Sequence, residues 1–270
     1  MPELPEVDAV RRQLDPAMRG ARFDRVLVRR KDLRQPFPPR FAERLVGQTV
    51  RNVARRGKYL VVDLSSNETL LMHLGMSGSF DVTRTAANGG ANPHDHVVFN
   101  MSSGTRITYN DPRRFGMMDV VPSQALERHL DGIGPEPLSP DFNAASLAMA
   151  CAGKRTSLKA ALLDQRVVAG LGNIYASEAL HLAGLSPKRR ASTIATPSGR
   201  PREHAYRLVA AIKTVLRRAI ERSAARSYRT SRFRVYDRAA ERCQTRGCLG
   251  TIRRITQAGR STFYCPVCQK

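Results

Sequence analysis

The sequence predicts an α+β protein built from more than one domain. An amphipathic helical pattern opens the chain, and short alternating or apolar runs broken by turn residues extend from Phe23 to about Val121. A Pro/Gly-rich segment comes next, the residues after it show helical periodicity, and strand patterns return near the C-terminus. At 270 residues the chain is long enough for two domains of ordinary size. We therefore expect an N-terminal helix with an antiparallel β-sandwich or barrel, a helical domain and a C-terminal β-hairpin that carries four cysteines.

The first expected element is a helix over residues 3–18. Pro5 fits its first turn, where the missing N–H of proline costs no hydrogen bond. Apolar residues then recur at helical spacing, at Val7, Val10, Leu14 and Met18. The start of the chain is thus expected to be mounted on a rigid element.

A mostly antiparallel β domain is expected to follow this helix. Its strands are runs of apolar or alternating residues bounded by turn residues, at 23–29, 49–54, 59–64, 69–74, 96–101 and 105–109. Residues 83–95 contain Asn88-Gly89-Gly90 and Asn92-Pro93, which are typical of a mobile surface loop.

The segment from Gly132 to Pro140 divides the chain near its middle, because its glycines and prolines interrupt both kinds of periodicity. Helical segments follow it at 144–152, 156–164, 173–183 and 203–222. Residues 221–234 are basic and poor in apolar side chains, which indicates a flexible linker. The expected organisation is an N-terminal β domain over 1–131, a hinge over 132–142, a helical domain over 143–234 and a cysteine-rich domain over 235–270.

The composition indicates a polyanionic partner. The chain has 45 Lys and Arg against 23 Asp and Glu, a formal net charge of +22 and a pI of about 11.0. Solubility does not require so large an excess, so nucleic acid is the first expectation. The alternative is an anionic membrane surface, but no run approaches the roughly 18 apolar residues of a spanning helix. Because the N-terminus also lacks the apolar stretch of a signal peptide, we expect a cytoplasmic protein that works on DNA or RNA.

Four of the five cysteines lie in the last 28 residues, as Cys243-x4-Cys248-x16-Cys265-x2-Cys268. Two close pairs separated by a hairpin-length insert suit a tetrahedral thiolate site for zinc, because each pair spans a tight turn. The alternative, two disulfides, would need an oxidising compartment that nothing in the sequence indicates. We therefore predict one structural Zn²⁺ and no redox or nucleotide cofactor. Cys151 is left over and is expected to be an inert apolar side chain.

Pro2 is a candidate nucleophile if Met1 is removed. An α-amino group titrates near about 7.7–8.0 and a lysine near about 10.4, so far more of the α-amine is neutral at pH ~7.4. Only the neutral amine attacks a carbonyl carbon, and the iminium formed by a secondary amine stays cationic without a proton. Glu3 adds a carboxylate beside it. The alternative is that Pro2 merely permits methionine removal.

Other residues fit DNA binding, each with a structural alternative. Gly170-Leu171-Gly172-Asn173 precedes a predicted helix, so its backbone N–H groups could bind a phosphate, or it is an ordinary turn. Lys58 leads into a strand and could clamp a phosphate or supply a second amine, or it belongs to a solvated charge run. Met76 and Phe115 lie on glycine-flanked turns, where an apolar tip could wedge into DNA or pack in the core.

Together these residues resemble the formamidopyrimidine-DNA glycosylase family, the bacterial base-excision enzymes for oxidised purines. The matching motifs span nearly the whole chain in family order: Pro-Glu-Leu-Pro-Glu-Val from residue 2, Gly-Lys-Tyr-Leu at 57–60, His-Leu-Gly-Met-Ser-Gly at 73–78, Asp-Pro-Arg-Arg-Phe-Gly at 111–116, Gly-Asn-Ile-Tyr-Ala-Ser-Glu at 172–178 and the terminal four-cysteine finger. The resemblance implies removal of 8-oxoguanine and formamidopyrimidines from damaged double-stranded DNA, followed by β,δ-elimination at the abasic site. The protein is expected to act as a monomer.

The resemblance also implies roles for individual residues. Pro2 would attack C1′ of the damaged nucleotide to form a Schiff base, and Glu3 would move protons on the opened sugar. Lys58 would assist β-elimination, and Arg260 would reach the phosphate removed in δ-elimination. The implied DNA contacts are Glu6, Met76, His94, Arg113, Phe115, Arg155, Lys159 and Asn173. Met76, Arg113 and Phe115 would fill the gap left by the extruded base. The glycine turn and its helix would belong to a helix-two-turns-helix element.

One departure from the family pattern concerns the preferred lesion. The family commonly carries a longer, Gly-Gly-containing loop before Val235, and that loop folds over the everted lesion. Here Ser223 to Arg234 is shorter and lacks the glycine pair. Two alternatives therefore stay open. One is an endonuclease VIII type enzyme for oxidised pyrimidines, against which Leu4 argues because that branch usually has glycine there. The other is a non-catalytic zinc-finger DNA-binding protein.

Overall fold

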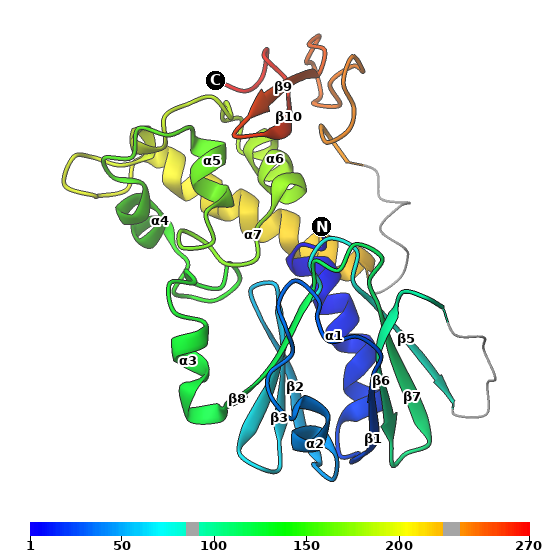
Figure 1. Cartoon of the computed structure of the whole chain (residues 1–270). Coiled ribbons are helices and arrows are strands. Elements are labelled where there is room, and N and C mark those ends of the chain that lie inside the picture. The colour runs from blue at the N-terminus through cyan, green and yellow to red at the C-terminus, as the bar shows by residue number, and fades with distance from the viewer. Residues whose placement is uncertain (85–91, 224–232) are drawn as a thin grey trace. The chain divides into compact units, whose positions relative to one another are not determined.

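The computed structural model describes residues 1–84, 92–223 and 233–270 of the chain. They form two compact units, Met1–Asp131 and Gly132–Lys270, each with its own hydrophobic core (Figure 1). Most of the expected surface loop at 83–95 and of the expected linker at 221–234 lies outside the described residues. Among the described residues, no helix is both long enough and apolar enough to cross a membrane.

Unit 1 begins with helix α1 (Leu4–Met18), as the periodicity predicts. The backbone N–H of Glu3 donates to the Glu6 carboxylate over 2.9 Å, which satisfies one of the unpaired donors at the start of the helix. The buried face of α1 consists of Leu4, Pro5, Val7, Leu14 and Met18. Along this face α1 packs against strands of both sheets of the unit.

The two sheets of unit 1 are four-stranded and antiparallel, which makes this unit a β-sandwich. One sheet has the order β1 (Phe23–Val28), β6 (Asp95–Met101), β7 (Thr105–Asn110), β5 (Ser79–Arg84). The other has the order β2 (Val50–Arg56), β3 (Tyr59–Leu64), β4 (Glu68–His73), β8 (Met117–Pro122). Side chains of both sheets share one apolar cluster, in which Phe23 and Phe99 pack edge to face with centroids 5.4 Å apart.

Several elements of unit 1 were not expected from the sequence. They are β5, β8, the short helices α2 (Phe41–Leu45) and α3 (Leu126–His129), and a 3-10 turn at Ser123–Ala125. β5 buries only Phe80, because it lies at the edge of its sheet and its other side chains are exposed or half-buried. Helices of one turn leave no measurable apolar period.

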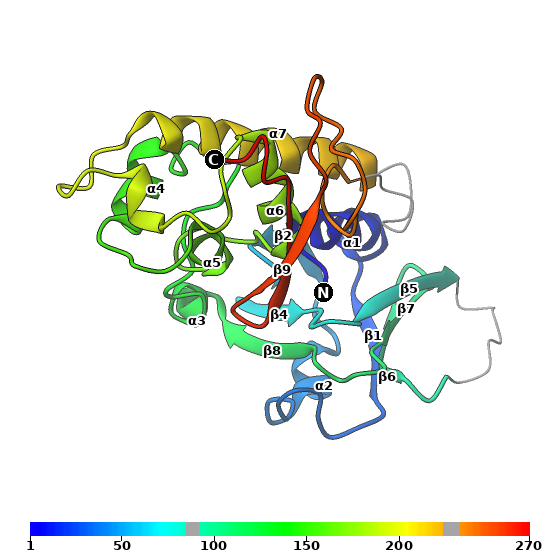
Figure 2. The same ribbon diagram turned by 90° about the horizontal axis from the view of Figure 1, so that it is seen from above.

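Unit 2 is mainly helical. Its helices are α4 (Ala144–Cys151), α5 (Leu158–Leu163), α6 (Asn173–Leu182) and α7 (Glu203–Ser223), with a 3-10 turn at Ala191–Ile194. The side chain of Asn143 caps α4 by accepting the N–H groups of Ala145 and Ser146, each over 3.0 Å. Helix α6 packs against α7 on one side and against the C-terminal hairpin on another (Figure 2).

Residues 132–142, which were expected to be a hinge, contain no helix or strand. Backbone hydrogen bonds join them to the rest of unit 2. The N–H of Gly134 donates to the carbonyl of Gln165 over 2.8 Å, and the N–H of Ala169 donates to the carbonyl of Pro135 over 3.0 Å. Phe142 is fully buried in the core of unit 2. The boundary between the units therefore falls before this segment, at Asp131 and Gly132.

The C-terminal hairpin pairs β9 (Arg253–Gln257) with β10 (Arg260–Tyr264). Its turn places Ala258 and Gly259 at positive φ, 48° and 70°. The hydrophobic cluster of this region is small, and its buried members are Val235, Cys243, Ile252, Phe263 and Cys265. So small a core stabilises little structure by itself, and such regions usually need a covalent or metal crosslink.

Candidate active site

The start of α1 holds Pro2 and Glu3 in defined positions. Glu3 directly precedes the helix and is only 3% exposed, and Pro2, one residue earlier, is half-buried. Glu6 accepts the backbone N–H of Glu3, so Glu6 shapes this end of the helix. While Met1 is attached, the Pro2 nitrogen belongs to a peptide bond. The chemistry predicted for Pro2 therefore requires that Met1 be removed.

Lys58 is a second amine in unit 1, and its surroundings are not those of a solvated charge run. It is 7% exposed and follows Gly57, whose φ of 57° forms the turn between β2 and β3. Burial, the positive charge of Lys58 and that of Arg34 together lower the pKa of His73 to about 4, burial being the largest cause. The ring of His73 is therefore neutral near pH 7.

His73 is a residue that the sequence analysis did not single out, although it belongs to the motif at 73–78. Its Nδ1 accepts the backbone N–H of Gly75 over 3.0 Å, at the turn that carries Met76. Its ring also packs against Tyr59, with centroids 5.0 Å apart. The neutral His73 ring thus packs on β3, the strand that follows Lys58, and hydrogen-bonds the turn that carries Met76.

The turn that carries Met76 and the turn that carries Phe115 are fixed to each other by Asp111, which is fully buried. One carboxylate oxygen of Asp111 accepts the Ser77 hydroxyl over 2.5 Å. The other accepts the Gly116 N–H over 2.8 Å and the Tyr109 hydroxyl over 3.2 Å. Burial and the negative charge of Asp111 raise the pKa of Tyr109 well above its usual value, so its hydroxyl stays a donor. The two turns form one hydrogen-bonded block.

Glycine is required where the two turns touch. Gly75 has a φ of 61°, and a Cβ atom there would lie 2.2 Å from the carbonyl carbon of Phe115. This contact leaves both tips outside the core, with Met76 42% and Phe115 44% exposed. The guanidinium of Arg113 lies 4.9 Å from the centre of the Phe115 ring, a cation–π contact. The core alternative for Met76 and Phe115 is therefore wrong.

His94 lies on the same side of unit 1 as this block. It is exposed in the turn just before β6, and its carbonyl accepts the N–H of Asp111 over 3.0 Å. The structure thus brings together four of the residues expected to contact DNA: Met76, His94, Arg113 and Phe115. They come from three connecting segments, which follow β4, precede β6 and follow β7, and each is bonded to or packed on the Asp111 block.

The Asp111 block gives a testable prediction. Asp111→Asn should lower the free energy of unfolding by about 1–3 kcal/mol, because an amide nitrogen would face donors that now share a carboxylate. Urea denaturation of the isolated variant measures this change. Asp81→Asn is the matched control, since Asp81 is exposed on β5 and its replacement should cost less than about 0.5 kcal/mol. Equal stability of the two variants would contradict the structural role of Asp111.

In unit 2, Lys159 and Asn173 lie against the start of β10. Lys159 is 1% exposed, and its ammonium donates to Asn173 Oδ1 over 2.6 Å, to Thr262 Oγ1 over 2.7 Å and to the Ser261 carbonyl over 3.1 Å. Asn173 Nδ2 donates to the same carbonyl over 3.0 Å. These bonds hold the residue next to Arg260 in place. Lys159 and Asn173 therefore join helices α5 and α6 to the hairpin that presents Arg260.

Arg155 and Arg260 are both exposed. Arg155 lies between α4 and α5, and Arg260 is the first residue of β10. The glycine turn before α6 has Gly170 at a φ of 75° and Gly172 as the residue that precedes the helix. Asn173, the first residue of α6, uses its side chain for the hairpin.

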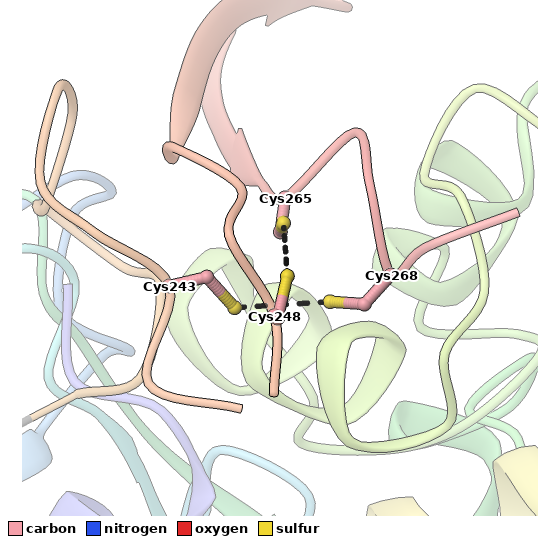
Figure 3. A group of neighbouring side chains, drawn as sticks. All are labelled: Cys243, Cys248, Cys265 and Cys268. Atoms are coloured by element: carbon pink, nitrogen blue, oxygen red, sulfur yellow. Dashed lines mark hydrogen bonds between the residues drawn. The ribbon is translucent and has the colours of Figure 1, made fainter. Parts of the chain in front are cut away.

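The four C-terminal cysteines come together as their spacing predicts (Figure 3). Their sulfur atoms all lie within 4.8 Å of one another, with Cys243 and Cys268 3.8 Å apart and Cys248 and Cys265 3.6 Å apart. A disulfide would need about 2.05 Å, so the cysteines are free thiols in a cluster that could hold a metal ion. The disulfide alternative does not fit this geometry.

Backbone N–H groups point at the sulfurs of this cluster. The N–H of Thr245 lies 3.5 Å from Cys243 Sγ, and that of Gly250 lies 3.4 Å from Cys248 Sγ. Such donors stabilise thiolates rather than thiols. Cys151 is different, because its burial in the core of unit 2 raises the pKa of its thiol to about 11. Cys151 is thus the inert apolar residue expected from the sequence.

Taken together, the features of the two units define a helix-two-turns-helix DNA glycosylase with a four-cysteine finger. Residues 1–118 match the formamidopyrimidine-DNA glycosylase N-terminal domain, and residues 133–231 match the H2TH domain of the same enzymes. The chain belongs to the formamidopyrimidine-DNA glycosylase family. The resemblance seen in the sequence motifs and the fold class expected from them are confirmed.

Relatives in both sequence and structure cover the whole chain. The formamidopyrimidine-DNA glycosylases of Rhodopseudomonas palustris strain BisA53 and of Afipia carboxidovorans are 56% and 57% identical to it, over 100% of each chain. A solved structure of the Lactococcus lactis enzyme, bound to DNA that contains Fapy-dG, has 28% identity and a TM-score of 0.86. It covers 99% of this chain and 100% of that chain.

Proposed function

We propose that this protein excises oxidised purines from damaged double-stranded DNA and then cleaves the strand at the abasic site. The observation that carries the proposal is a full-length match to curated formamidopyrimidine-DNA glycosylases, in a chain whose Pro2 and Glu3 lie at the buried start of α1. Structures of the Lactococcus lactis enzyme contain DNA with Fapy-dG or an abasic site, which supports these substrates. Such a protein would act in the cytoplasm, on the DNA of the nucleoid.

The proposed chemistry begins when the neutral amine of Pro2 forms a bond to C1′ of the damaged nucleotide. The bond from C1′ to the base breaks, and the base leaves with a proton. The C1′–O4′ bond then opens as the carboxylic acid of Glu3 gives its proton to O4′, which leaves an iminium between Pro2 and C1′. This cation draws electrons from C2′.

Strand cleavage follows by two eliminations. Loss of a proton from C2′ expels the 3′ phosphate, and loss of a proton from C4′ expels the 5′ phosphate. Water then hydrolyses the iminium and frees Pro2. We propose that Lys58 assists the first elimination and that Arg260 binds the phosphate that leaves in the second. Two observations support these roles. Lys58 is buried, and Lys159 and Asn173 hydrogen-bond the carbonyl of Ser261, the residue next to Arg260.

The proposed DNA contacts fall into two groups. In unit 1, Met76, Arg113 and Phe115 fill the gap left by the extruded base, while Glu6 and His94 lie nearer the everted nucleotide and its backbone. Their exposure on one hydrogen-bonded block supports a wedge. In unit 2, the exposed Arg155 contacts the DNA directly, whereas Lys159 and Asn173 act through their bonds to the hairpin that presents Arg260. For the domains of the chain we propose a β domain over 1–131, a hinge over 132–142, a helical domain over 143–234 and a cysteine-rich domain over 235–270.

We also propose that the four-cysteine cluster holds one Zn²⁺. The sulfur geometry and the backbone donors support a tetrathiolate site, and four thiolates would leave no coordination position for water. The ion would crosslink the finger and take no part in the reaction. The cysteines would supply every ligand, and the chain would need no other cofactor.

Borohydride trapping tests the proposed function. The protein is incubated with duplex DNA that contains 8-oxoguanine opposite cytosine, and borohydride reduces any iminium to a stable covalent adduct. We expect an adduct with the lesion duplex and none with an undamaged duplex of the same sequence. A duplex with an oxidised pyrimidine distinguishes the endonuclease VIII alternative. Absence of any adduct would leave only the non-catalytic DNA-binding alternative.

Binding to DNA should depend steeply on salt, because the net charge of +22 implies phosphate neutralisation. Affinity for duplex DNA, measured by fluorescence anisotropy from low to moderate KCl, should fall with a log–log slope of about −0.9 for each phosphate neutralised. Arg155→Ala should make this slope shallower by about one phosphate contact. An affinity that does not change with salt, or a slope that Arg155→Ala leaves unchanged, would refute the electrostatic basis of binding.

A further inference from the structure

His181 lies on α6 directly beside the cysteine cluster and is only 4% exposed. Its Nε2 atom is 3.5 Å from Cys243 Sγ and 3.8 Å from Cys268 Sγ. The Thr245 hydroxyl lies 3.3 Å from the same nitrogen. The imidazole therefore faces one edge of the group of four sulfurs, outside the group itself.

The two ring nitrogens of His181 differ in their surroundings. Nδ1 is buried and has no hydrogen-bond partner in the described part of the chain, whereas Nε2 faces two sulfur atoms. A thiolate bound to a metal can only accept a hydrogen bond, so two such sulfurs require a proton on the nitrogen that faces them. In a neutral imidazole, a proton on Nε2 leaves Nδ1 without one, which agrees with the lack of a hydrogen-bond partner for Nδ1 in the described part of the chain.

We propose that Nε2–H of His181 donates to the metal-bound thiolates of Cys243 and Cys268 and thereby strengthens metal binding. This inference rests on the proposed zinc site. A Zn²⁺ with four thiolates carries a net negative charge, which N–H donors disperse. Backbone N–H groups already donate hydrogen bonds to the sulfurs of Cys243 and Cys248. His181 adds a donor that comes from a helix outside the finger, so His181 is a positioning residue for the finger.

The same helix is bonded to the finger at two further places. The Glu178 carboxylate accepts the N–H groups of Arg234, Val235 and Tyr236 over 2.8–2.9 Å. Asn173 donates to the Ser261 carbonyl over 3.0 Å. His181 is the one of these three anchors that contacts the cysteine sulfurs. Its bond makes the docking of the finger on α6 sensitive to whether the metal is bound.

The test is metal affinity in a competition with a chromogenic chelator. His181→Phe keeps a flat ring and removes the donor, and it should weaken Zn²⁺ binding by about 10–100-fold, the usual cost of removing a group that hydrogen-bonds a metal ligand. His181→Gln keeps a side-chain N–H and should recover part of the loss. His129→Phe is the control, because His129 is exposed on α3 in the other unit. With Co²⁺ in place of Zn²⁺, the thiolate-to-metal charge-transfer band should shift in His181→Phe alone.

A change in affinity of less than about twofold in His181→Phe, with an unshifted Co²⁺ band, would overturn the proposal. If the parent protein itself binds no metal, the zinc proposal fails together with it, and the parent measurement separates these two outcomes. Should His181→Phe not fold, ¹⁵N NMR of the zinc-loaded parent decides. A proton on Nε2 is expected, and a proton on Nδ1 alone would overturn the proposal.

Discussion

Replacing Glu3 with glutamine is expected to lower the rate of base excision and strand cleavage by about 10²–10⁴-fold, the usual contribution of a positioned acid or base. Glutamine has nearly the same shape but cannot give a proton to O4′ of the sugar. Because Glu3 is 3% exposed at the start of α1, bulk water cannot easily replace it as the proton source. Single-turnover kinetics on an 8-oxoguanine duplex measure the effect without a contribution from product release.

The matched control for this variant is Glu43→Gln. Glu43 is exposed on α2 and pairs with Arg40, so its replacement removes an equal charge far from the N-terminus in sequence. Binding of both variants to the duplex should match the parent protein. A Glu3→Gln enzyme that retains parental excision rates would refute the role of Glu3.

The identity of the nucleophile follows from where the trapped adduct forms. Peptide mapping of the borohydride-reduced complex should place the sugar on Pro2, in a protein that lacks Met1. Pro2→Gly presents a primary amine in place of the secondary one and should reduce trapping strongly. An adduct on Lys58, a buried amine of the same unit, would contradict the proposal for Pro2.

Removal of the metal is expected to abolish DNA binding while leaving unit 1 folded. Structural Zn²⁺ contributes about 10–16 kcal/mol in zinc-finger peptides. The finger cannot replace that contribution, because its buried apolar residues are few. Cys243→Ser should have the same result as chelation. Anisotropy with a lesion duplex measures binding, and amide exchange of the strands in unit 1 reports whether the sandwich persists.

Cys151→Ala is the matched control for Cys243→Ser, since Cys151 lies in the core of unit 2 away from the four-cysteine cluster. It should bind zinc and DNA as the parent does. Because unit 1 has its own core, the effect of metal removal should be confined to unit 2. Full DNA binding by metal-free protein would contradict a structural role for the ion.

The sequence predicted the long elements of the fold well, because each repeats its apolar period several times. Helices α1, α6 and α7 lie within a residue or two of their expected bounds. Strand β8 was missed because Met117 and Met118 begin it with two adjacent apolar residues and so hide its alternation. Edge strand β5 and the one-turn helices were missed because they depend on packing against other segments.

The sequence indicated the residues of the candidate site and the roles that the family resemblance implies, but not the bonds that position them. The bonds that position them join segments far apart in the chain, so no local pattern encodes them. Asp111 bonds Ser77 across 34 residues, and Lys159 bonds the Ser261 carbonyl across 102 residues. For the same reason, His73 and His181 acquire significance only in the structure. Lys159, expected at the DNA, is turned inward to the hairpin.

The contact between Gly75 and Phe115 has a consequence for how the proposed wedge of Met76 and Phe115 could vary. Because backbone touches backbone there, the spacing between the two tips is set without any contribution from the Met76 or Phe115 side chains. Either side chain could be exchanged for a larger or smaller one, and the distance between their attachment points would stay the same. The shape of the wedge and its placement can therefore change independently during evolution or engineering.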